Sequence, residues 1–130
     1  MGTDIHIYLE YRSRKSKQMK YGGEIYGVRL YGMFYVMALE YDLPPLFHLR
    51  GLPGDVTAQT FKEYRDWGSD AHSASWLSTN EFAACIVEAN IRFSEECILG
   101  WTKPYEEILE MMLDYEKYGE SCRIVFWFDN

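Results

Sequence analysis

The chain has 130 residues, a net charge of −7, 48% hydrophobic residues and 25% charged residues, a composition typical of a single soluble globular domain. Its acidity argues against general binding to DNA or RNA backbones, because such proteins place Lys and Arg on phosphates. Three cysteines without Cys-x-x-Cys spacing argue against a disulfide framework and a thiolate zinc site. We find no signal-peptide pattern and no membrane-spanning apolar run, so we expect a cytoplasmic protein without membrane association.

The first predicted element is a strand over 3–12, where apolar and polar residues alternate. Successive side chains of a strand point to opposite faces. One face should therefore be apolar, with Asp4 and His6 together on the other. The polar stretch 13–20, together with Gly22 and Gly23, predicts a hairpin connection, and 24–30 is weakly patterned as a second strand.

Helices are predicted over three ranges bounded by prolines, glycines or capping residues: 31–41, 58–67 and 82–91. Pro44 ends the first of them. Asp55 or Thr57 can cap the second, and Gly68 ends it. Ser78–Glu81 has the spacing of a capping box at the start of the third.

The segment 68–77 is made of small and polar residues and is predicted to be a loop. A fourth helix is predicted to begin at Thr102 and Pro104 and to end at Gly119. The last predicted element is a strand over 121–130 that is apolar on both faces, as central strands are. We therefore expect an α+β domain spanning residues 1–130. Its small, mainly antiparallel sheet should have adjacent N- and C-terminal strands, with the helices packed on one side.

Two Asp-x-His pairs, Asp4/His6 and Asp70/His72, are candidate metal ligands. Side chains two apart on a strand have α-carbons about 6–7 Å apart, so both can bind one divalent ion through oxygen and imidazole. Asp129 adds a carboxylate at the end of the last strand. The two pairs are also the candidate catalytic residues if the protein is an enzyme. The alternative is local hydrogen bonding for these side chains and solvent exposure for Asp129.

A second set of polar residues lies in predicted loops. Asp70–Trp76 combines an acid, an imidazole, two hydroxyls and an indole between alanines, so a backbone there can approach a ligand closely. Arg50 precedes a Gly- and Pro-containing loop and Arg29 precedes a helix, where each can bind a phosphate or carboxylate. The candidate ligand-binding residues are Arg29, Arg50, Asp55, Asp70, His72, Ser73, Ser75 and Trp76. The alternatives are a local turn network and pairing of Arg50 with Asp55 or a helix end.

Together these carboxylates, imidazoles and guanidiniums fit a pocket for a phosphorylated or nucleotide-like molecule. Trp67, Trp76 and Trp127 could stack on a base, although core packing is the alternative for each of them. Ser73 or Ser75 beside an imidazole suggests a nucleophile. The chain has no Gly-x-Ser-x-Gly motif, which argues against a serine hydrolase.

Five segments carry a resemblance to a known family: Gly2–His6, Arg29–Phe34 (Arg-x-Tyr-x-x-Phe), Arg50–Asp55 (Arg-Gly-Leu-Pro-x-Asp), Asp70–Leu77 (Asp-x-His-Ser-x-Ser-Trp-Leu) and Val125–Asn130 (Val-Phe-Trp-Phe-Asp-Asn). By these motifs the chain resembles a widespread family of bacterial and phage proteins that has no settled activity. Relatives often carry an Ala-Gly-Val-Arg-like stretch where this chain reads Met37–Tyr41. If that arginine binds a ligand in them, this chain lacks it or uses another. The phage context implies a protein that blunts host defence by sequestering or cleaving a cyclic-nucleotide or ADP-ribose-type signal.

Three functions follow as hypotheses. The first is a phage-type binding protein, or sponge, that sequesters a nucleotide-like molecule in the bacterial cytoplasm. The aromatic content of 17% agrees with a pocket closed across a homo-oligomer interface. The second is a metal-dependent phosphodiesterase or related hydrolase, in which the Asp and His residues hold one or two divalent ions that activate water. The third is an acidic inhibitor that binds a partner protein by mimicking nucleic acid.

Overall fold

The structure is a computed structural model that describes residues 4–13, 15–26, 31–38, 44–92, 102–118 and 120–129. Its elements are β1 (Asp4–Ser13), β2 (Lys20–Ile25), α1 (Tyr31–Met37), α2 (Ala58–Trp67), the short 3₁₀ helix η1 (Gly68–Asp70), β3 (Ala71–Ser78), α3 (Thr79–Arg92), α4 (Lys103–Lys117) and β4 (Glu120–Asp129).

The four strands form one antiparallel sheet in the order β2-β1-β4-β3. The expected α+β class is confirmed, and so is the adjacency of the N- and C-terminal strands. The β1–β4 pairing runs without a break from Asp4 opposite Asp129 to Ser13 opposite Glu120. β4 lies between β1 and β3 and is covered on both faces, which explains its nearly continuous apolar sequence.

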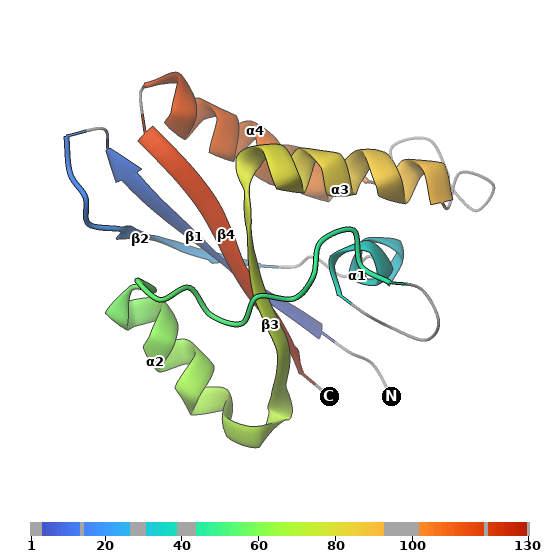
Figure 1. Ribbon diagram of the computed structural model, residues 1–130, viewed down its shortest axis with the longest axis horizontal. Coiled ribbons are helices and arrows are strands. Elements are labelled where there is room, and N and C mark those ends of the chain that lie inside the picture. Colours follow the sequence, from blue (N-terminus) through green and yellow to red (C-terminus); the bar gives the residue numbers. More distant parts are fainter. Residues whose placement is uncertain are drawn as a thin grey trace.

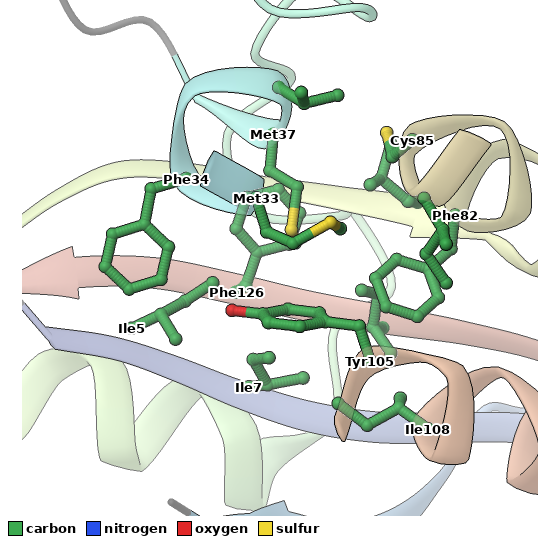
Figure 2. Packing of buried hydrophobic residues seen from close by; sticks show 14 of the residues in the cluster. Ile5, Ile7, Met33, Phe34, Met37, Phe82, Cys85, Tyr105, Ile108 and Phe126 are labelled. Carbon is green, nitrogen blue, oxygen red and sulfur yellow. The ribbon is translucent and has the colours of Figure 1, made fainter. Parts of the chain in front are cut away.

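The larger hydrophobic core lies between the sheet and the helices α1, α3 and α4, which share one side of it (Figure 1). Alternate residues of β1 and β4 point into this core, among them Ile7 and Phe126. Figure 2 shows Tyr105 of α4 lying among side chains of the sheet and of α1 and α3, including Met33 and Phe82. These three helices therefore pack on one face, as the sequence predicts, but the prediction that all helices share that face is wrong for α2, because the aromatic residues on the second face of the sheet also need to be buried.

Helix α2 lies on the other face of the sheet (Figure 1). The intervening residues of β1 and β4 form a second, smaller core there, made of Tyr8, Val125 and Trp127. The ring of Tyr64 from α2 packs edge-on against Trp127, with ring centroids 5.1 Å apart. Helix α2 shields this face from water, and burying so large an aromatic surface is favourable.

The capping signals of the sequence are realised in the structure. Thr57 caps α2, since its hydroxyl oxygen accepts from the Thr60 amide at 3.3 Å, and Gly68 follows the helix at φ 59°, where glycine avoids a steric penalty. Ser78 and Glu81 form a reciprocal capping box at the start of α3. The Ser78 amide donates to the Glu81 carboxylate at 3.0 Å, and the Glu81 amide donates to the Ser78 hydroxyl at 3.3 Å.

The prediction of a loop over 68–77 is wrong for most of that segment, because 71–78 is the edge strand β3. Small and polar residues have little strand preference of their own, so the strand depends on partners that are distant in sequence. One edge pairs with β4. On the other side the Gly51 amide donates to the Ala74 carbonyl at 2.9 Å.

The second strand also differs from its prediction, because β2 covers Lys20–Ile25 and includes both glycines of the expected connection. A Cβ on Gly22 would lie 3.0 Å from the Leu9 carbonyl oxygen, so glycine permits close pairing there. Part of the expected strand 24–30, and the end of the expected helix 31–41, lie outside the described residues. In the part of the chain that is described, no helix has the length and apolar character needed to cross a membrane.

Candidate functional site

The candidate metal ligands singled out by the sequence gather at one end of the sheet. Asp4 and Ala71 pair with Asp129 from opposite sides, so the starts of β1 and β3 meet the end of β4. We call this region, with the adjoining end of α2 and η1, the Asp129 end. It contains all the candidate metal ligands: Asp4, His6, Asp70, His72 and Asp129.

The central feature of the Asp129 end is a direct contact between His6 and Asp129, which joins imidazole Nε2 to the carboxylate Oδ2. Both side chains are largely buried, with 14% and 15% of their surfaces exposed. The imidazole also lies near two indoles, with ring centroids 4.3 Å from Trp67 and 6.2 Å from Trp127. The ring orientation of His6 is therefore fixed by a charge partner and by packing.

This pairing decides which chemistry His6 can perform. A carboxylate that accepts a hydrogen bond from one ring nitrogen fixes the tautomer, which leaves the other nitrogen as a hydrogen-bond acceptor or metal ligand. Because Asp129 holds Nε2, the available atom is Nδ1. The pair can therefore accept a proton, accept a hydrogen bond from a ligand, or contribute one ligand to a metal.

His72 lies on the opposite face of the sheet from His6. It pairs with Phe128, whose side chain belongs to the larger core, and the two rings are 6.2 Å apart. His72 Nδ1 lies 3.0 Å from the Ser73 hydroxyl, while its Nε2 is buried without a hydrogen-bond partner among the described residues. Ser73 has φ 57°, a conformation that costs energy for a residue other than glycine.

The five candidate metal ligands do not form one centre. The sheet separates His72 from His6, and Asp70 is exposed in η1. Within the ranges that the structure describes, no three His, Cys, Asp or Glu side chains are grouped so that they could hold a metal ion. What the fold brings together from this set is the His6–Asp129 pair.

Arg50 is held by structural partners. Its guanidinium binds the Glu81 carboxylate through both terminal nitrogens, with Nη1 to Oε1 at 2.8 Å. Nη1 also donates to the Trp76 carbonyl at 3.1 Å, and the group lies 4.5 Å above the Trp76 ring. The hydrogen bonds from Arg50 lower the pKa of Glu81 to about 2. Arg50 thus joins the loop before α2 to the first turn of α3.

Asp55, whose side chain is 56% exposed, pairs with Arg123 of β4, which is the centre of an ionic network buried on its Glu10 side. Arg123 donates to Glu10 from Nε at 2.9 Å and Nη2 at 2.6 Å, and to Asp55 from Nη1 at 2.7 Å. The second oxygen of Glu10 accepts from the Thr57 amide at 2.9 Å and from its hydroxyl at 2.6 Å. The hydrogen bond from Arg123 is the main cause of the lowered pKa of Asp55. The network fastens the start of α2 to the sheet.

The remaining candidates are placed as follows. The Ser75 hydroxyl accepts from the Arg50 amide at 3.0 Å, and Trp127 is fully buried. Trp67 is 36% exposed beside His6. Arg29 lies outside the described residues. Of the expected ligand-binding residues, those around Arg50 hold the loop in place, while Asp70 is exposed in η1, one residue before the Ala71 that pairs with Asp129.

Sequence reasoning missed Glu10 and Arg123, although a signal for them existed. Glu10 continues the polar face of β1, and Arg123 interrupts an apolar strand. With the two strands predicted to be antiparallel neighbours, opposite charges at corresponding positions suggest a cross-strand pair. The register places them directly opposite each other.

The comparisons with known proteins add no family to these observations. No protein-family model, curated protein or solved structure matched the chain.

Proposed function

We propose that the protein binds a small nucleotide-like molecule at the Asp129 end of the sheet. The observation that supports this proposal is the His6–Asp129 contact. An imidazole whose tautomer is fixed offers a directional hydrogen-bonding atom, which suits recognition of the polar edge of a base or sugar.

Trp67 gives the proposed site a stacking surface. Its indole lies 4.3 Å from the His6 ring and is 36% exposed, so part of it is open to a planar ligand. Stacking of a base on an aromatic side chain contributes about 1–3 kcal/mol. A ligand that combines a flat ring with polar edges therefore fits this end better than an aliphatic one.

The charges at the Asp129 end favour recognition of the base or sugar over recognition of the phosphate. Three carboxylates lie there, those of Asp4, Asp70 and Asp129. The guanidiniums of Arg50 and Arg123 are engaged by carboxylates elsewhere. A phosphate would be repelled at this end unless it pointed away or brought a divalent ion with it.

The wider setting belongs to the same proposal. The protein would act in the bacterial cytoplasm as a phage-type, homo-oligomeric sponge that withholds a signalling nucleotide of host defence. Its net charge of −7 is compatible with this role, because binding through base and sugar does not require a basic surface.

Isothermal titration of the full chain with adenosine, guanosine and 3′,5′-cyclic AMP tests the proposal. We expect saturable binding of at least one probe. His6→Gln and Trp67→Ala should each weaken it about tenfold, corresponding to ~1.4 kcal/mol, because a hydrogen bond or a stacking surface is lost. The matched control is His48→Gln, which removes an exposed histidine outside the Asp129 end.

Equal affinity in His6→Gln and His48→Gln would place any binding elsewhere, and absence of binding by all three probes would contradict the proposal. Mass spectrometry of small molecules released by denaturing the purified protein provides a second measurement. Release of an intact nucleotide supports sequestration, whereas release of its hydrolysis products contradicts it.

The same contact favours one second function, hydrolysis of such a molecule. With Asp129 holding Nε2, Nδ1 of His6 could take a proton from water as the water oxygen bonds to phosphorus and the P–O bond to the 3′ oxygen breaks, and the imidazolium could then return that proton to the departing 3′ oxygen. Turnover of 3′,5′-cyclic AMP to AMP that is lost in His6→Gln and kept in His48→Gln would favour this function over sequestration.

A further inference from the structure

A pocket of about 350 Å³ lies at the opposite end of the sheet from Asp129, between the end of α4 and the start of β4. It is lined by Met111, Asp114, Tyr115, Tyr118 and Glu120. The ten residues of β4 separate the two ends, which corresponds to about 30 Å. The volume lies within the range of about 300–1,000 Å³ that small-molecule sites occupy.

The lining comes from one face of a helix and one strand residue. The four α4 and cap residues are spaced i, i+3, i+4 and i+7, so they lie side by side along the helix. Tyr115 is anchored, because its ring stacks on Tyr11 of β1 with centroids 4.7 Å apart. Tyr118 is 80% exposed and Met111 is 43% exposed. The pocket therefore has one fixed aromatic wall and one accessible one.

The electrostatics of the pocket favour a cation. Asp114 and Glu120 supply two carboxylates, against the single basic residue of the last helical turn, Lys117. The C-terminal end of the fifteen-residue helix adds the negative end of its dipole. Tyrosine rings attract cations through their electron-rich faces. Burial raises the pKa of the Tyr115 hydroxyl, so this ring is neutral at physiological pH.

We propose that this pocket binds an alkylated ammonium group, held between the tyrosine rings with the two carboxylates as counter-charges. Methyl groups on nitrogen spread the charge and weaken hydration, so such a cation gains more from aromatic faces and the Met111 thioether than a bare ammonium does. The group could belong to a small quaternary amine or to a methylated lysine side chain. This site is independent of the proposed nucleotide site.

The test is an amide-resolved NMR titration of the full chain with choline, with 3,3-dimethyl-1-butanol as the uncharged molecule of the same shape. We expect choline to shift amides around Met111, Asp114, Tyr115, Tyr118 and Glu120 and to bind at least about fivefold more tightly than the alcohol. A trimethyllysine peptide and its unmodified counterpart form the second arm. Tighter binding of the modified peptide than of choline identifies a protein ligand, and the reverse identifies a small amine.

Two variants of Tyr118 separate the ring from its hydroxyl. Tyr118→Phe should keep choline binding within about twofold, and Tyr118→Ala should weaken it about fivefold or more. Tyr26→Ala, which removes a tyrosine that is 78% exposed on the β2 side, is the matched control and should leave binding unchanged. Unshifted amides around the pocket with every probe would overturn the proposal. Equal binding of choline and the alcohol would overturn it as well, since the pocket would then be merely apolar.

Discussion

Removing the Arg123 side chain should leave a buried carboxylate without its counter-charge. Glu10 is 0% exposed and receives two hydrogen bonds from Arg123, at 2.9 and 2.6 Å. Hydrogen bonds to charged groups contribute about 1.5–3 kcal/mol each, and breaking a buried ion pair costs about 3–5 kcal/mol. We therefore expect Arg123→Met to lower the free energy of unfolding by about 3–5 kcal/mol, measured by urea denaturation followed by circular dichroism.

The double variant Glu10→Gln/Arg123→Met distinguishes an uncompensated charge from lost packing. Glutamine keeps an acceptor for Thr57 but carries no charge, so the double variant should be about 2 kcal/mol more stable than Arg123→Met. Lys62→Ala is the control, because it breaks an exposed ion pair with Asp66 at 3.0 Å and should cost no more than about 0.5 kcal/mol. The reasoning is refuted if Arg123→Met costs no more than Lys62→Ala, or if the double variant is the less stable of the two Arg123 variants.

Three further predictions concern acid, thiols and strain. The pKa of Glu81 is about 2 in the folded chain against 4.5 for an unperturbed glutamate, so its ion pair contributes fully above pH 4.5 and is lost as the pH falls toward 2. The free energy of unfolding of the wild type should fall by about 2 kcal/mol over that window after allowance for partial exposure. Urea denaturation at pH 7 and pH 3 should show a measurably smaller fall for Glu81→Gln. Burial raises the pKa of Cys85 and of Cys122 to about 12. In a Cys97→Ser variant, Ellman's reagent at pH 8 should therefore label no thiol in the native state and both in urea, and rapid native labelling would contradict this. Because Ser73 has φ 57°, Ser73→Gly should be about 2 kcal/mol more stable than Ser73→Val, and equal stabilities would show that the conformation carries no strain.

The fold was predictable where local pattern and tertiary environment agree. The alternation of apolar and polar residues predicted β1. Apolar residues on both faces of the last predicted strand indicated β4 and its central place in the sheet. Thr57, Gly68 and the Ser78–Glu81 box marked helix ends through hydrogen bonds that involve near neighbours in sequence. Such signals need no knowledge of the rest of the chain.

β3 was not predictable from its own residues. Alanine, serine and histidine favour no strand, and the segment becomes one because β4 and the loop at Gly51 offer hydrogen-bonding partners. Because β3 was not predicted as a strand, the orientation of His72 could not be predicted either. That orientation depends on an irregularity in the register between His72 and Ser75.

The candidate site was predictable only in part. The adjacency of the terminal strands brings His6 and Asp129 to one end of the sheet, and both were candidates from the sequence. The role of Arg50 depends on Glu81, which is 31 residues away. No pattern around Arg50 distinguishes a guanidinium that awaits a ligand from one that already holds a carboxylate.

The central place of β4 has a consequence for how the chain is made. β1 and β4 are the most extensively paired strands, yet the contacting residues His6 and Asp129 are 123 positions apart. A nascent chain on the ribosome therefore carries β1 and β3 without the strand that joins them until β4 emerges. Closing so long a loop is entropically costly and slows folding. We expect the sheet to assemble after β4 is synthesised, with the apolar faces of the earlier elements exposed to chaperones until then.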